Sequence, residues 1–166
     1  MKTNKPPKSK KGSDIFQTPL GTFDNVLQYV PKDYIIWEPA CGKGNIVKDL
    51  TQHGYKVIGT DIEDEYDFFT YQPKQFDIVI TNPPYSIKDK WIKRCYELNK
   101  PFILLLPLTA LEGIKRQELY RQYGVSVMLF NKRINYETPS GKGSGAWFPS
   151  CLLSWGLNLP SNLMFI

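Results

Sequence analysis

The sequence has few of the residues that build disulfide frameworks and metal sites. Its 166 residues include three cysteines, which lie far apart and form no C-x-x-C pair, and a single histidine. We therefore expect neither a metal site nor a disulfide-stapled domain, and a reducing cytoplasm fits the cysteines best. Long apolar runs are missing as well, since the run 102–106 is stopped by Pro107. We therefore expect no contact with a membrane.

Charge is distributed unevenly along the chain. The net charge is +5, and residues 1–11 hold five lysines and no acid. Residues 12–87 hold five basic and eleven acidic side chains, whereas residues 88–142 hold eleven basic and five acidic ones. This asymmetry indicates a polyanionic partner, although a solubilising tail and solvated lysines would give the same composition. No apolar stretch follows the first lysines, so we expect a disordered basic arm over residues 1–13 and no secretory signal.

Strand-like and helix-like segments alternate after the arm. We expect strands at 34–37, 56–62, 77–81, 102–106, 125–130 and 147–155, and helices at 23–30, 45–50, 88–98 and 115–123. Such alternation is typical of an α/β fold with a mostly parallel sheet and helices on both faces. The length leaves room for one such domain, over residues 14–166, and not for a second one of catalytic size.

A glycine-rich segment follows the first expected strand. It reads Glu38-Pro39-Ala40-Cys41-Gly42-Lys43-Gly44, and its glycines allow a sharp turn and a close approach of a ligand to the backbone. A segment between a strand and a helix lies at the carboxyl edge of a parallel sheet, where ligands bind. It matches neither the phosphate-binding GK[ST] loop nor the full G-x-G-x-x-G pattern, since residue 47 is valine. A glycine turn without a ligand is the alternative.

Asp61 supports the ligand hypothesis. It stands at the end of the second expected strand, about 20 residues after the glycine-rich segment. An acid in this position can accept hydrogen bonds from a ribose diol. The combination therefore indicates a cofactor that contains adenosine, although a lone Asp at a strand end is also a common cap.

The segment Asn82-Pro83-Pro84-Tyr85 follows the third expected strand and indicates chemistry at an amino group. Pro83 holds Asn82 in an extended conformation, and the two prolines stiffen the segment. The Asn82 amide oxygen and the Pro83 carbonyl then form two acceptors at a fixed spacing, which suits the two hydrogens of an NH₂ group. The Tyr85 ring can stack on the planar group that bears the amine. An ordinary Pro-Pro turn is the alternative.

Taken in order, these motifs resemble class I S-adenosylmethionine-dependent amino methyltransferases with an NPPY motif, especially DNA adenine-N6 methyltransferases. The resemblance covers residues 14 to about 157 and implies a Rossmann-like fold with a seven-stranded type of sheet. It implies catalytic roles for Asn82, Pro83, Pro84 and Tyr85. The implied cofactor-binding residues are Gln17, Thr18, Pro19, Glu38, Pro39, Ala40, Cys41, Gly42, Gly44, Asp61, Ile62, Asp67, Phe68 and Asn82.

The activity that the resemblance implies is methyl transfer from S-adenosylmethionine to the amino group of adenine in DNA. Nucleic acid would be contacted by the basic arm and the 88–142 stretch, and the candidate substrate contacts are Tyr85, Lys132, Arg133 and Trp147. RNA adenine and protein glutamine are alternative substrates, since similar motifs occur in enzymes that act on them. A non-catalytic subunit that binds the cofactor or nucleic acid is the alternative of another class.

Three departures from the family pattern affect these expectations. Glu38 and Ala40 stand where the DNA enzymes often have Asp and an aromatic residue. Only a few residues separate Asp61 from Asp67, so the usual helix between them is short or missing. The chain also has no room for the separate target-recognition domain of such enzymes, so a protein partner would supply sequence recognition.

Overall fold

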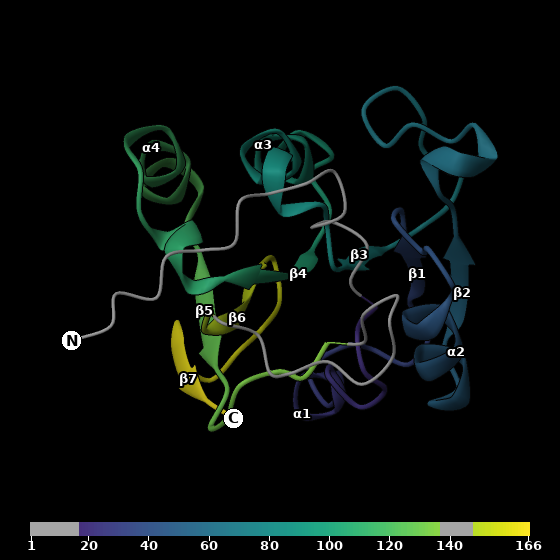
Figure 1. Ribbon diagram of the computed structural model, residues 1–166, viewed down its shortest axis with the longest axis horizontal. Coiled ribbons are helices and arrows are strands. Elements are labelled where there is room, and N and C mark those ends of the chain that lie inside the picture. Colours follow the sequence, from purple (N-terminus) through teal and green to yellow (C-terminus); the bar gives the residue numbers. More distant parts are fainter. Residues whose placement is uncertain (1–16, 137–147) are drawn as a thin grey trace, which may run out of the picture.

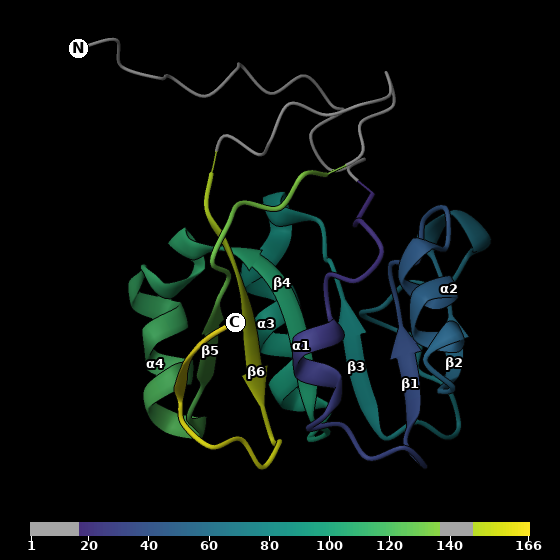
Figure 2. The ribbon, with the colours of Figure 1, turned by 90° about the horizontal axis from the view of Figure 1, so that it is seen from below.

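The computed structural model describes residues 17–136 and 148–166, which form a seven-stranded sheet in the order β2-β1-β3-β4-β6-β5-β7 (Figures 1 and 2). The strands are β1 Ile35–Glu38, β2 Lys56–Gly59, β3 Ile78–Thr81, β4 Phe102–Pro107, β5 Ser126–Leu129, β6 Ser150–Trp155 and β7 Leu163–Phe165. Among these strands only β6 runs against its neighbours β4 and β5, and all the other pairs are parallel. The mostly parallel sheet predicted from the sequence is confirmed.

Helices cover both faces of the sheet. They are α1 Asp24–Leu27, α2 Asn45–Gln52, α3 Lys88–Glu97 and α4 Ile114–Tyr123, with 3₁₀ turns η1 Ile62–Asp64, η2 Tyr85–Ile87 and η3 Leu108–Leu111. Figure 1 shows α3 and α4 on one face, and α1 and α2 on the other. None of the helices within the described ranges is long and apolar enough to cross a bilayer.

Alternating side chains of the central strands supply both apolar cores. One core joins α1 and α2 to Ile36, Ile78, Ile80, Ile103 and Leu105. The other joins α3 to Trp37, Val79, Phe102, Leu104 and Leu106. All six residues of β4 are buried, as expected for a strand covered on both faces. The α/β fold with helices on both faces is thus confirmed.

The structure differs most from the sequence prediction at three elements, and the other bounds shift by only a few residues. β2 ends at Gly59 rather than at residue 62, because Asp61 caps η1 by accepting a hydrogen bond from the Glu63 N–H at 3.1 Å. The helix predicted over 23–30 is regular only in the single turn α1. The strand β7 was not predicted, and it extends the sheet by pairing with β5.

The strand order reverses next to β1, and this reversal locates the site. β2 lies on one side of β1 and β3 lies on the other. The loops that leave the carboxyl ends of β1 and β3 therefore run in opposite directions and leave a crevice between them, which is where open α/β sheets bind ligands. All described strands except β6 present their carboxyl ends at this edge, the upper edge in Figure 2.

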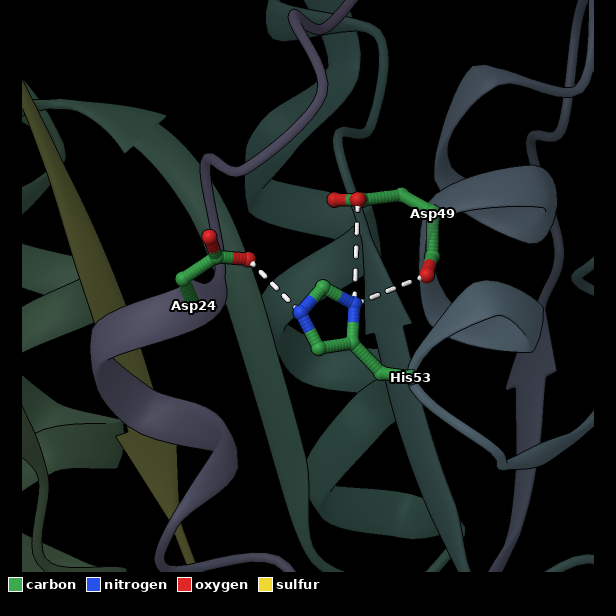
Figure 3. Close-up of side chains that lie close together, drawn as sticks. All are labelled: Asp24, Asp49 and His53. Carbon is green, nitrogen blue, oxygen red and sulfur yellow. Dashed lines mark hydrogen bonds and ion pairs between the residues drawn. The ribbon is translucent and has the colours of Figure 1, made fainter.

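His53, the residue directly after α2, links α2 to α1 (Figure 3). Its Nε2 lies 3.3 Å from Asp24 Oδ1, and its Nδ1 lies 2.9 Å from the Asp49 carbonyl oxygen. The buried Asp49 carboxylate also accepts the Gly21 backbone N–H at 2.9 Å. Together these contacts hold α1 and the residues just before it against α2. The same segment continues toward residues 17 and 18, at the carboxyl edge of the sheet.

Candidate active site

A cavity of about 410 Å³ lies at the carboxyl edge of β1, β2 and β3. This volume is within the range of roughly 300–1,000 Å³ that is common for small-molecule sites. Its wall is built mainly from the loops that follow these three strands. Of the predicted cofactor residues, the wall brings together Gln17, Thr18, Pro39, Ala40, Cys41, Gly42, Asp61, Ile62, Asp67, Phe68 and Asn82.

The glycine-rich loop after β1 is held by hydrogen bonds from both sides. The Gly42 N–H donates to Asp61 Oδ2 at 2.8 Å, and the Lys43 N–H donates to Gln17 Oε1 at 3.2 Å. Gly42 has a φ of +49°, and a Cβ on it would lie 3.1 Å from Gln17 Nε2. Gly44 has a φ of +84° and caps α2. Glycine is therefore required at these turns, because other residues are strained in this region of backbone space.

Asp61 keeps acceptor capacity after fastening the loop. Each of its carboxylate oxygens accepts one backbone N–H, from Gly42 and from Glu63. A carboxylate offers about four lone-pair positions, so each oxygen can accept a second hydrogen bond. Asp61 also lines the cavity, so its remaining acceptor positions are compatible with the ribose diol that the sequence predicts there.

Aromatic side chains form another part of the cavity wall. The rings of Phe68 and Trp91 stack with their centroids 4.0 Å apart, and Phe69 meets Trp91 edge to face. The sequence prediction missed eight lining residues, which are Lys43, Asn45, Ile46, Glu63, Tyr66, Phe69, Ile87 and Trp91. All except Trp91 lie within two positions of a predicted residue, whereas Trp91 comes from the buried face of α3.

Glu38 supports the site from beneath and lies outside the cavity wall, as do Pro19 and Gly44 in the described part of the chain. Glu38 Oε1 accepts the Ala40 N–H at 2.9 Å and the Thr81 hydroxyl at 2.5 Å, which ties the end of β1 to the end of β3. Burial raises the pKa of Glu38 to about 8, although the two hydrogen bonds act in the opposite direction.

Cys41 lines the cavity but does not resemble an activated nucleophile. Burial is the largest cause that raises the pKa of its thiol, to about 11, and the nearby Glu38 and Asp61 act in the same direction. The side chain therefore remains a thiol at neutral pH, whereas a nucleophilic cysteine needs a lowered pKa.

Asn82 directly follows β3, and the two ends of its side-chain amide differ in their hydrogen bonding. Its Nδ2 donates to Thr18 Oγ1 at 3.0 Å. Its Oδ1 is buried and accepts no hydrogen bond within the described residues. A buried acceptor without a partner costs about 1–3 kcal/mol, so a ligand that donates a hydrogen bond to this oxygen would recover that energy. Pro84 lines the cavity beside Asn82.

Tyr85 lies outside the cavity wall and turns toward the loops that flank β5 and β6. Its hydroxyl lies 2.9 Å from the Tyr136 hydroxyl, and its ring meets Phe148 edge to face with the centroids 5.6 Å apart. Of the segment after β3, Asn82 and Pro84 thus face the cavity with the predicted cofactor residues. Tyr85 instead contacts Tyr136 and Phe148, which lie outside the cavity wall in the described structure.

The remaining predicted substrate residues do not meet at the cavity. Lys132 and Arg133 are exposed and stand three and four positions after the end of β5, at the same edge of the sheet. Trp147 lies outside the described residues, and so does the predicted basic arm, residues 1–13.

No protein-family model and no curated protein sequence matches the chain. Solved structures with a similar fold do exist. The methyltransferase subunit of a type I restriction-modification system from Streptococcus thermophilus matches 93% of the chain, with 12% identity and a TM-score of 0.57. A modification subunit of a putative type I restriction enzyme from Vibrio vulnificus matches 88%, with 11% identity and a TM-score of 0.53. The chain spans about half of each subunit, 48% and 45%.

A third structure is similar over nearly its whole length. Precorrin 8W decarboxylase from Methanobacterium thermoautotrophicum matches 87% of this chain and 98% of its own, with 12% identity and a TM-score of 0.51. At such low identity these likenesses concern the fold alone. Together with the strand order, they show that the chain has the Rossmann-like fold found in class I methyltransferases.

Proposed function

We propose that this protein transfers a methyl group from S-adenosylmethionine to the exocyclic amino group of adenine in DNA. The observation that carries the proposal is the Asn82 amide, whose buried oxygen has no partner within the described residues and stands beside a cavity of cofactor size. The resemblance of the segment Asn82-Pro83-Pro84-Tyr85 to the motif of DNA adenine-N6 methyltransferases favours a DNA substrate, and the fold is one that methyltransferase subunits of restriction-modification systems also have.

The residues around the cavity fit S-adenosylmethionine. Asp61 has acceptor positions left for a ribose diol, and the apolar and aromatic side chains of Ile62 and Phe68 suit a purine ring. Gly42 allows a ligand to approach the backbone of the loop closely. When bound, S-adenosylmethionine supplies an electrophilic methyl group on its sulfonium.

Asn82 and Pro83 then act on the amine that receives the methyl group. The lone pair of an exocyclic amine is delocalised into its ring, which makes the amine a poor nucleophile. Hydrogen bonds from its two N–H groups to Asn82 Oδ1 and the Pro83 carbonyl draw the nitrogen toward tetrahedral geometry and localise the lone pair. Holding the amine in line with the methyl group supplies the rest by proximity and orientation. No strong general base is needed, because the amine becomes very acidic once it is methylated.

Tyr85 supplies the surface for the base itself. An adenine in duplex DNA has to leave the stack before its amino group can reach Asn82. Stacking on an aromatic side chain is worth about 1–3 kcal/mol per base and replaces part of what is lost. The Tyr85 ring is well suited because its hydroxyl is held by Tyr136 and its ring by Phe148.

Basic side chains at the same edge supply the attraction for the phosphates. They follow the carboxyl ends of β3, β4 and β5, and they are Lys88, Lys90, Lys115, Lys132 and Arg133, which we call the carboxyl-edge cations. The five lysines of residues 1–11 would add to them. Phosphate contacts carry no sequence information directly, so a protein partner would supply target recognition.

The proposal is tested by incubating the protein with labelled S-adenosylmethionine and with DNA, RNA or protein. Digestion and nucleoside analysis should identify N6-methyladenine in the DNA, and Asn82→Ala should remove most of this signal while leaving cofactor affinity nearly unchanged. Asn25→Ala, which changes an exposed residue of α1, is the matched control. If only RNA adenine or only protein glutamine is labelled, the proposed substrate is wrong and that alternative is the substrate. If no substrate is labelled, the proposal that the protein is a methyltransferase is refuted, and a non-catalytic binding subunit is favoured.

A further inference from the structure

We propose that Thr18 is a positioning residue that holds the side-chain amide of Asn82 in place for methyl transfer. The inference rests on the proposed function and adds a residue that acts through Asn82 rather than on the reacting atoms. Thr18 precedes Asn82 by 64 positions, and its hydroxyl accepts the hydrogen bond from Asn82 Nδ2 at 3.0 Å.

The orientation of this amide decides whether the site can use the amine. The oxygen and the nitrogen of an amide have nearly the same size, but one accepts hydrogen bonds and the other donates them. With Nδ2 on Thr18, the Asn82 oxygen is the atom left for a ligand, and it is buried with no partner in the described structure. In the opposite orientation the N–H groups of the amide would face those of the substrate amine, although the Thr18 hydroxyl could still hold the amide by donating to its oxygen. The substrate amine therefore favours the orientation with Oδ1 toward it, and Thr18 anchors the other end of the amide.

Thr18 is well fixed in its own position. Its side chain is 4% exposed, and its carbonyl oxygen accepts a hydrogen bond from Asn45 Nδ2, in the first residue of α2, at 3.2 Å. The neighbouring Gln17 accepts the Lys43 N–H at 3.2 Å. Residues 17–18 are therefore hydrogen-bonded both to the glycine-rich loop and to Asn82 at the end of β3. This short segment links the glycine-rich loop to the Asn82 amide.

Thr22 provides a matched control for the loss of one side-chain hydrogen bond in the segment before α1. It lies in the same segment, is 8% exposed, and donates from its hydroxyl to the Pro19 carbonyl at 2.7 Å. Like Thr18, it loses one hydrogen bond when it is replaced by valine of nearly equal shape. In the described structure Thr22 Oγ1 bonds to Pro19 and Asn82 Nδ2 bonds to Thr18, so Thr22→Val tests the effect of losing a hydrogen bond in this segment without changing the bond to Asn82.

The first experiment measures kcat for DNA methylation and the affinity for S-adenosylhomocysteine. Thr18→Val should lower kcat by about tenfold, which corresponds to one hydrogen bond at the upper end of the usual range. Thr18 also lines the cavity, so the affinity for S-adenosylhomocysteine is measured in each variant and kcat is compared at saturating S-adenosylmethionine. Thr18→Ser retains the hydroxyl and should restore kcat, and Thr22→Val should leave it near the wild-type value. Because Thr18 acts through Asn82, Thr18→Val should cause no further loss in an Asn82→Ala background. A wild-type kcat in Thr18→Val, or a full further loss in the double variant, would overturn the inference.

A second measurement needs no turnover and separates the two proposals. In ¹⁵N-labelled protein, the side-chain amide protons of Asn82 should exchange slowly with water in the wild type and in Thr18→Ser, and much faster in Thr18→Val. Equal exchange in all three proteins would refute the role of Thr18. Slow exchange in a wild type that methylates no DNA, RNA or protein would instead refute the proposed function and leave the hydrogen bond between Asn82 and Thr18 established.

Discussion

The hydroxyl oxygens of Tyr85 and Tyr136 lie 2.9 Å apart, and the Tyr136 hydroxyl also lies 2.9 Å from Ser150 Oγ. Tyr136 and Ser150 are buried, so this chain of hydrogen bonds ties the Tyr85 ring to the sheet. Burial is the largest cause that raises the pKa of Tyr136, which keeps its hydroxyl protonated and able to donate. The ring proposed to stack on the base is thereby held in place before any base arrives.

Tyr136→Phe should weaken capture of the base. It removes the hydroxyl that holds Tyr85, and one hydrogen bond contributes about 0.5–1.5 kcal/mol. We expect the KM for DNA to rise by roughly 3- to 10-fold, while the affinity for S-adenosylhomocysteine stays constant. Tyr85→Phe should be as mild, because the ring face does the stacking, whereas Tyr85→Ala should be worse.

Tyr55→Phe is the control for losing a buried tyrosine hydroxyl. Tyr55 is 3% exposed, and its hydroxyl donates to the Leu27 and Val30 carbonyls, next to α1 and far from Tyr85 in sequence. It should reduce stability without changing the KM for DNA. Equal KM values in all three tyrosine-to-phenylalanine variants and the wild type would refute a positioning role for Tyr136.

The parts of the fold that could be predicted from the sequence depend on local patterns. Short apolar runs that alternate with helical periodicity specify a parallel sheet, and the structure confirms it. The glycine-rich loop, Asp61 and Asn82 follow strands in the sequence, and strand ends meet at one edge. Their approach to a common cavity therefore follows from topology alone.

The parts that could not be predicted depend on contacts between distant segments. β7 has only three residues, in a stretch that also holds Pro160 and two asparagines, so no alternation marks it. Nothing in the spacing of Tyr85 and Tyr136 shows that their hydroxyls meet. Trp91 lies on the buried face of α3, and this face reaches the cavity because of how α3 packs on the sheet, which no local pattern shows.

Asp61→Ala should weaken binding of S-adenosylhomocysteine. A charge-assisted hydrogen bond contributes about 1.5–3 kcal/mol, so losing the ribose contacts should lower the affinity by at least about tenfold in calorimetry. The loss of the bond to the Gly42 N–H, which fixes the loop, acts in the same direction. Asp64→Ala is the control, because Asp64 is an exposed acid of η1 outside the cavity wall in the described structure. Unchanged affinity in Asp61→Ala would contradict the assignment of the cavity.

Glu38 should make the folded protein less stable as the pH rises. Its pKa is raised from 4.5 to about 8, chiefly by burial. Between these values the folded chain holds a proton that the unfolded chain has released, so the free energy of unfolding falls with increasing pH. One proton corresponds to at most about 1.4 kcal/mol per pH unit.

Glu38→Gln should remove this contribution, because glutamine resembles the protonated acid and keeps the acceptor for Ala40 and Thr81. Urea unfolding between pH 5 and 8 should show the variant gaining stability over the wild type as the pH rises. Glu118→Gln changes an exposed glutamate of α4 and should leave the pH dependence of the wild type intact. Parallel curves for the wild type and Glu38→Gln would show that Glu38 ionises in the folded protein as it does in the unfolded chain.

The last prediction concerns attraction to nucleic acid. Residues 12–166 carry equal numbers of basic and acidic side chains, so binding should depend on the lysines of residues 1–11 and the carboxyl-edge cations. Each phosphate contact adds about −0.9 to the slope of log K against log salt for duplex DNA. Replacing Lys2, Lys5, Lys8, Lys10 and Lys11 by glutamine should make this slope shallower by a few units, and cofactor affinity should not change.

A set of lysines at the opposite edge of the sheet separates specific contacts from overall charge. Lys56, Lys74 and Lys100 are exposed and stand at or before the amino ends of β2, β3 and β4. Their replacement by glutamine lowers the net charge without removing a cation from the carboxyl edge. If only overall charge matters, each replaced lysine should weaken DNA binding by a similar amount, whether it belongs to residues 1–11 or to the set Lys56, Lys74 and Lys100. If the first lysines contact phosphates beside the site, the amino-edge set should leave the salt slope unchanged. An unchanged slope after replacing the first five lysines would leave them a solubilising role alone.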